Sequence, residues 1–140
     1  MNRFWNCGLN DQHFHLISNI ISSGNITQLH IDCNPSILES NYCSLLGEES
    51  LLRIVSFRGN QITDNGVRMM AVMLKSNHSL LSLDLFDNKI QKNGADALSD
   101  VLKTNTTLQS LNLGKNHIGD EGLIHISKVC PYDYTSIDDS

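Results

Sequence analysis

Three asparagines in the second half of the chain recur with a spacing of 28 residues and constrain its fold more than any other feature. They are Asn60, Asn88 and Asn116, and apolar residues surround each of them at fixed offsets in the pattern LxxLxLxxNxI. The apolar positions of the three copies are filled by Leu52, Val55, Phe57 and Ile62, then Leu80, Leu83, Leu85 and Ile90, then Leu108, Leu111, Leu113 and Ile118. A period of this length predicts an array of stacked structural units.

Each unit contains two apolar periodicities. The LxL segment alternates with period two, which predicts a strand with its leucines on one face. Further on, residues such as Ala95, Leu98 and Leu102 have the spacing of an amphipathic helix. A glycine follows each asparagine at a fixed offset, at Gly66, Gly94 and Gly122. A glycine before the helix is expected to permit a turn, because it has no Cβ.

One such unit cannot bury its own apolar face, so neighbouring units must stack. Strands are narrower than helices, so the stack should curve with its strands inside and its helices outside. The asparagine is expected to bond backbone groups that the turn leaves unpaired. The recurring asparagines are therefore interpreted as structural residues.

Two weaker units precede the three regular ones. The second begins Ile26, Leu29, Ile31, Asn34, lacks the glycine, and departs from the pattern at Pro35, so that the step to Asn60 is 26 residues. The first is represented by Phe4, Cys7 and Leu9 at a strand end and turn, and by Ile17, Ile20 and Ile21 on a helix face. We therefore predict about four repeats and an N-terminal half repeat over residues 1–130, followed by an acidic tail over 131–140.

The stretch LLSLDLFDNKIQKNGADALSDVLKTNTTLQSLNLGKNHIGDEGL resembles ribonuclease-inhibitor-like leucine-rich repeats, and the resemblance covers about residues 4–130. The 28-residue unit is the form found in NOD-like receptors and in the Ran GTPase-activating protein. The resemblance implies an α/β leucine-rich-repeat solenoid, a partial horseshoe with parallel strands on the concave face and helices on the convex face. It also implies protein binding through the concave face and adjacent loops.

Residues that alternate with the core leucines are expected to point into the concavity. Exposed tryptophan, arginine, phenylalanine and isoleucine side chains are typical of protein interfaces. The predicted protein-binding residues are Trp5, His30, Asp32, Ile54, Ser56, Arg58, Asp84, Phe86, Asp87 and Asn112.

Composition argues against several other classes of function. A net charge of −5 disfavours nucleic acid or an anionic membrane as the main partner. Neither a signal peptide nor a membrane span is visible, and the four cysteines form no CxxC pair, which together favour a reduced, cytoplasmic setting. The six histidines are scattered, and no GxSxG or GxxxxGK[ST] motif occurs, so we expect no metal, no cofactor and no catalysis.

Two alternatives to a general protein-binding scaffold stay open. One is a regulator that docks a small GTPase and stimulates it. The other is a non-autonomous fragment of a larger NOD-like-receptor-type protein, because Met1 falls at the third position of its repeat. The first unit also has no clear polar cap, which predicts possible self-association through the N-terminal end.

Overall fold

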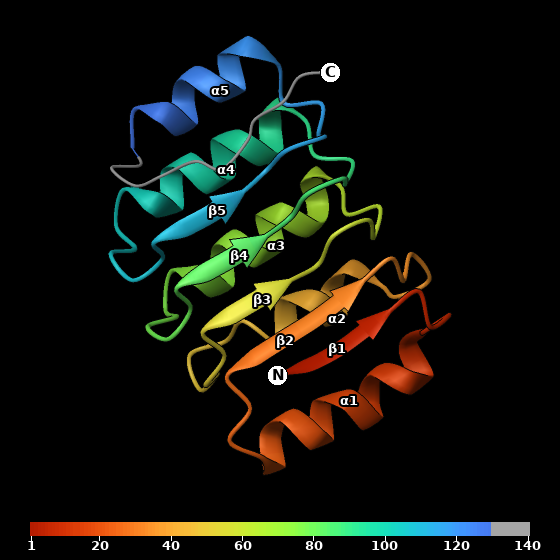
Figure 1. The fold of residues 1–140 in the computed structure, drawn as a ribbon. Coiled ribbons are helices and arrows are strands. Elements are labelled where there is room, and N and C mark those ends of the chain that lie inside the picture. The colour runs from red at the N-terminus through yellow and green to blue at the C-terminus, as the bar shows by residue number, and fades with distance from the viewer. Residues whose placement is uncertain (130–140) are drawn as a thin grey trace.

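The computed structural model describes residues 1–129, in which strands and helices alternate along the chain (Figure 1). The strands are β1 (Asn2–Trp5), β2 (Gln28–Asp32), β3 (Ile54–Ser56), β4 (Ser82–Asp84) and β5 (Ser110–Asn112). The helices are α1 (Asp11–Ser23), α2 (Glu39–Ser44), α3 (Asp64–Leu74), α4 (Lys92–Leu102) and α5 (Gly119–Ser127). The predicted leucine-rich-repeat solenoid is confirmed.

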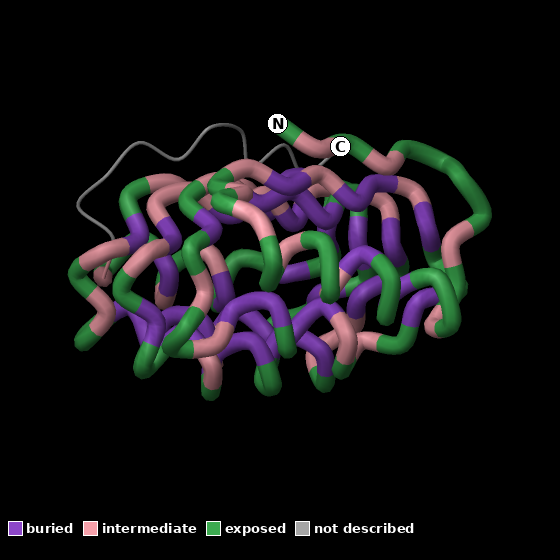
Figure 2. Tube along the Cα trace, turned by 90° about the horizontal axis from the view of Figure 1, so that it is seen from below, coloured by how far each residue is buried: buried purple, intermediate pink, exposed green. Residues whose placement is uncertain are grey.

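The strands form one parallel sheet in the order β1-β2-β3-β4-β5, and the helices stack along its other side (Figure 1). The register follows the sequence repeat, because Val55 pairs with Leu83 and Leu83 pairs with Leu111. Buried residues recur in every unit of the array (Figure 2), so the core is one continuous layer between sheet and helices.

The repeating asparagines bond backbone groups of the turns, as predicted, and these bonds also link each unit to its neighbour. The Asn88 carboxamide oxygen accepts hydrogen bonds from the backbone N–H groups of Asn60 and Ile62 in the preceding unit. Its amide nitrogen donates to the carbonyls of Phe57 and Leu85. One side chain therefore satisfies backbone groups on both sides of a turn.

The explanation predicted for the glycines is wrong. Gly66, Gly94 and Gly122 lie inside the first turn of their helices, and none of them has a positive φ. A Cβ on Gly94 would lie 2.6 Å from the Asp64 carboxylate oxygen and 2.7 Å from the Ile90 side chain. Glycine is used here because the helix packs closely against the preceding unit, and a turn conformation is not involved.

The irregular second unit has a short helix, α2, of 6 residues. The Tyr42 side chain fills the core in this unit and is completely buried. Its ring centroid lies 4.8 Å from that of Phe57 and 6.5 Å from that of Phe14. Its hydroxyl donates to the Asn34 carbonyl over 3.0 Å. The sequence pattern did not reveal this residue.

The first unit is only partly packed. Ile17 is buried and Ile21 is half-buried, but Ile20 is 53% exposed, so its predicted place on the packed helix face is wrong. Phe14 takes part in the core instead. The corresponding position in α4, Val101, is 1% exposed, and α4 packs against a helix on each side, α3 and α5. Ile20 has no such neighbour among residues 1–129.

None of the helices in residues 1–129 is long and apolar enough to cross a bilayer. Within the same range Cys7, Cys33 and Cys43 are free thiols. The fourth cysteine, Cys130, and the predicted tail at 131–140 lie outside the described residues.

Candidate protein-binding surface

The concave face is built from side chains that alternate with the core residues of the strands. Pairing between β1 and β2 places Arg3 beside His30 and Trp5 beside Asp32. The intervening residue Phe4 faces the core, where it packs against the buried cluster. The short strand pattern predicted Trp5 on this surface, and the structure places it there, 63% exposed.

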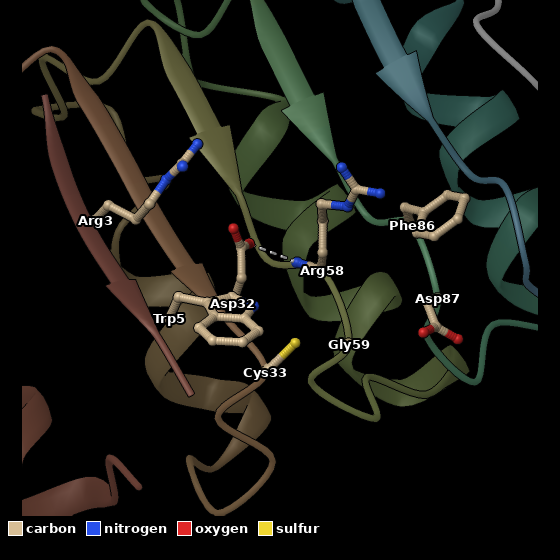
Figure 3. Close-up of a pocket in the computed structure, with 8 residues that line it drawn as sticks. All are labelled: Arg3, Trp5, Asp32, Cys33, Arg58, Gly59, Phe86 and Asp87. Atoms are coloured by element: carbon tan, nitrogen blue, oxygen red, sulfur yellow. Dashed lines mark hydrogen bonds between the residues drawn. The ribbon is translucent and has the colours of Figure 1, made fainter. Parts of the chain in front are cut away.

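A pocket of about 400 Å³ opens on the concave face toward the carboxyl ends of the strands (Figure 3). It is lined by Arg3, Trp5, Asp32, Cys33, Arg58, Gly59, Phe86 and Asp87. The structure thus brings together half of the predicted binding residues: Trp5, Asp32, Arg58, Phe86 and Asp87. The remaining ones, His30, Ile54, Ser56, Asp84 and Asn112, lie on the strands beside the pocket and do not line it.

Arg3 is a pocket residue that the sequence reasoning missed. Its exposed side chain lies two positions before Trp5 in β1, and alternate residues of a strand share a face. The alternation that selected Trp5 was therefore a sufficient signal for Arg3.

Asp32 and Ser56 are buried, whereas the sequence predicted them to be open to a partner on the concave face. Asp32 is 7% exposed and Ser56 is 3% exposed. The Ser56 hydroxyl donates to the Asp32 carboxylate over 2.6 Å, and the backbone N–H of Arg58 donates to the same oxygen over 3.0 Å. A buried carboxylate requires such donors, so this pair holds the ends of β2 and β3 together.

Asp84 and Asn112 also support the backbone. The Asp84 carboxylate accepts from the N–H of Phe86 over 2.9 Å, and the Asn112 side chain accepts from the N–H of Gly114 over 3.0 Å. Both side chains are half-buried. They occupy the same repeat position and fix the chain where it leaves the strand.

Phe86 and Ile54 are half-buried, although the sequence predicted them as exposed. The Arg58 guanidinium carbon lies 4.3 Å from the Phe86 ring centroid, and the Lys115 ammonium lies 5.5 Å from it. Stacking on an aromatic face holds a guanidinium in position while leaving its N–H groups at the edge of the ring free to bond. Phe86 therefore positions the cations of Arg58 and Lys115 as well as offering apolar surface.

The residue before each repeat asparagine, and before Cys7 at the equivalent position of the first unit, has a left-handed backbone. The set comprises Asn6, Cys33, Gly59, Asp87 and Lys115, with φ values between 45° and 64°. At this position the backbone continues the ladder between units, because the N–H of Gly59 donates to the Phe86 carbonyl and that of Asp87 to the Gly114 carbonyl. We call this set the left-handed rim.

Within residues 1–129 no group of three or more histidine, cysteine, aspartate or glutamate side chains is arranged to hold a metal ion. Asn77 and Asn105 are the asparagines of two NxS/T sequences, the pattern of N-glycosylation sites, but both side chains bond to the backbone of helix-to-strand loops. Asn77 is 1% exposed, and its side chain binds the Leu46 carbonyl and the Leu80 N–H.

The fold and its register define a domain built from stacked repeats, and comparison with known families agrees. A family model described as Leucine Rich repeat matches residues 50–71, 76–99 and 104–127. The chain belongs to the leucine-rich-repeat family.

The solved structures that are similar to the chain include these two. One is the leiomodin-1 actin-binding site 2, with 22% sequence identity and a TM-score of 0.69, covering 85% of this chain and 70% of that one. The other is the tropomodulin C-terminal domain of Caenorhabditis elegans, with 11% identity and a TM-score of 0.69, covering 92% and 86%. A search of curated proteins found no match.

Proposed function

We propose that this domain is a non-catalytic intracellular scaffold that binds a protein partner through its concave face. The observation that carries the proposal is the exposed indole of Trp5 beside two arginines and Phe86 in one open pocket. These are the residue types that contribute most to protein interfaces, and they occupy the inner surface of a curved sheet. The 28-residue period further supports repeats of the ribonuclease-inhibitor-like kind.

The test compares capture of cellular proteins by the native domain and by surface variants, with quantification of every captured protein. Trp5→Ala and Phe86→Ala are expected to weaken capture of the same partner, each by about 1–2 kcal/mol. Ile124→Ala is the matched control, because Ile124 is an exposed apolar residue, 50% accessible, on the convex helix α5.

Actin is one purified protein to include, since the similar leiomodin-1 structure is named as an actin-binding site. Partner capture that survives Trp5→Ala and Phe86→Ala together, but falls with Ile124→Ala, would move the interface to the convex side.

A further inference from the structure

We infer that the concave pocket recognises an acidic, extended peptide segment, with two carboxylates of the partner bound by Arg3 and Arg58. This inference rests on the proposed function and specifies the chemistry of the partner. It follows from which charges in the pocket are already used and which are not.

The carboxylates near the pocket are largely occupied by the protein itself. Asp32 accepts bonds from the Ser56 hydroxyl and the Arg58 backbone, and Asp84 accepts from the Phe86 backbone. Asp87 is exposed, but in Figure 3 its carboxylate points away from both guanidinium groups. Acidic groups therefore contribute little free hydrogen-bonding capacity where the arginines lie.

The guanidinium groups of Arg3 and Arg58, in contrast, keep their hydrogen-bonding capacity. Within residues 1–129 no side-chain hydrogen bond is donated by either guanidinium, and Arg58 makes one long ion pair with the Asp84 carboxylate, 3.8 Å away, that leaves its N–H donors without a hydrogen-bond acceptor. An arginine side chain carries five N–H donors that suit a carboxylate in a bidentate geometry. Arg58 is also held over Phe86, so less side-chain freedom is lost when it binds a ligand.

The spacing of these groups fits an extended chain. Arg3 pairs with His30 and His30 with Ser56. Arg58 lies two residues beyond Ser56, so Arg3 and Arg58 are about 12 Å apart at the usual strand separation and rise. Acidic residues at positions i and i+4 of an extended peptide point to the same face and are about 13 Å apart. Trp5 lies beside them in the pocket with most of its indole exposed, ready to pack against an apolar residue between the two acids.

The experiment uses a fluorescently labelled hexapeptide with two glutamates four positions apart and a leucine midway between them, and binding is measured by fluorescence anisotropy. The glutamine and lysine versions of this peptide serve as comparison. The glutamate peptide is expected to bind best, and its binding should weaken as salt rises. Arg3→Glu and Arg58→Glu should each weaken it about tenfold.

Arg68→Glu is the matched control, since it makes the same charge change on the convex helix α3 and should leave binding unchanged. A charge-swap arm guards against misfolding: the Arg3→Glu, Arg58→Glu double variant should bind the lysine peptide more tightly than the native domain does. Asp87→Asn should tighten binding of the glutamate peptide.

Equal binding of the glutamate and glutamine peptides, or equal loss with Arg68→Glu, would overturn the inference. Weaker binding of the glutamate peptide by Asp87→Asn would also overturn it. Any of these results leaves the proposed function standing if Trp5→Ala and Phe86→Ala still reduce protein capture.

Discussion

At the scale of single residues, the fold depends on a few polar side chains that replace missing backbone partners. Asn34 repeats the arrangement of Asn88, accepting from the N–H groups of Cys7 and Leu9 and donating to the Phe4 and Asp32 carbonyls. A buried polar group without a partner is expensive. These asparagines therefore stabilise the fold through buried hydrogen bonds to the backbone of two units.

Asn88→Ala should lower the free energy of unfolding by about 3 kcal/mol, because it leaves backbone groups of two units unpaired. Denaturant unfolding measures the change. Asn93→Ala, at an exposed position in α4, is the control and should change the midpoint little. A larger loss from Asn93→Ala would show that the asparagines of the turns are not the stabilising ones.

Gly94→Ala tests the close approach between units. In an isolated helix this change stabilises by about 1 kcal/mol. Here the added Cβ meets Asp64 and Ile90 at less than contact distance, so we expect a loss of about 1–3 kcal/mol. Thermal unfolding of this variant beside Asn93→Ala separates the two effects, and a rise in melting temperature would refute the packing explanation.

Two buried groups predict a loss of stability in alkali. Burial, with a smaller contribution from Glu39, raises the pKa of Cys43 from 9.0 to about 12. Burial, Asp11 and Asp32 also raise the pKa of Tyr42. Both groups favour the neutral form in the folded state, so their contribution is complete below the unfolded pKa and is lost as pH rises through the folded one.

The urea midpoint should therefore fall between about pH 9 and pH 12. Cys43→Ala should show a smaller fall over the same interval than the native domain, after allowance for its own destabilisation at pH 7. Equal falls in both proteins would exclude the thiol as a source.

At the scale of strands and helices, α1 is the most weakly attached element. Helices α2 to α5 pack successively against one another, whereas α1 makes no comparable contact with α2. A groove of about 190 Å³ lies between them, lined in part by Ile21, Leu45 and Leu51. The first unit is held by the pairing of β1 with β2, by the bonds of Asn34, and by the Asp11 carboxylate, which accepts from the Leu38 N–H and the Asn41 side chain.

Hydrogen exchange should consequently be fastest in α1 among the longer helices. The amides of α1 are expected to exchange through local opening, while those of α3 and α4 require more extensive unfolding. Mass spectrometry of peptides covering each helix would detect the order. Faster exchange in α4 than in α1 would contradict it.

The regular elements of the fold were predictable because period and register coincide in this family of repeats. The positions of Leu83, Leu111 and Asn88 followed from spacing alone. Spacing does not reveal what fills an irregularity, so Tyr42 was missed. Nor does it reveal which outward-facing side chain folds back onto the backbone, so Asp32 was predicted as open surface when it is buried.

At the scale of the whole molecule, the array exposes apolar side chains at its N-terminal end. Leu16 is 63% exposed and Ile20 is 53% exposed, on the side of α1 that in later units faces another helix. Exposed apolar clusters at the end of a solenoid promote association. The concave pocket lies on a different surface, so self-association and partner binding should be separable.

Ile20→Lys should reduce any concentration-dependent increase in mass seen by light scattering, while leaving partner capture unchanged. Val72→Lys, at a 63% exposed position in the convex helix α3, is the control. Loss of association in the control alone would place the contact on the convex surface.

The left-handed rim has a consequence for how such a domain acquires a new partner. A cysteine, a glycine, an aspartate and a lysine adopt the same backbone there, at Cys33, Gly59, Asp87 and Lys115. At Cys33, Gly59 and Asp87 the backbone N–H donates to a carbonyl of the next unit, which holds this conformation against a cost of roughly 1–2 kcal/mol for a residue with a side chain. Single substitutions at the left-handed rim can therefore change the side chains offered to a partner while the backbone stays the same.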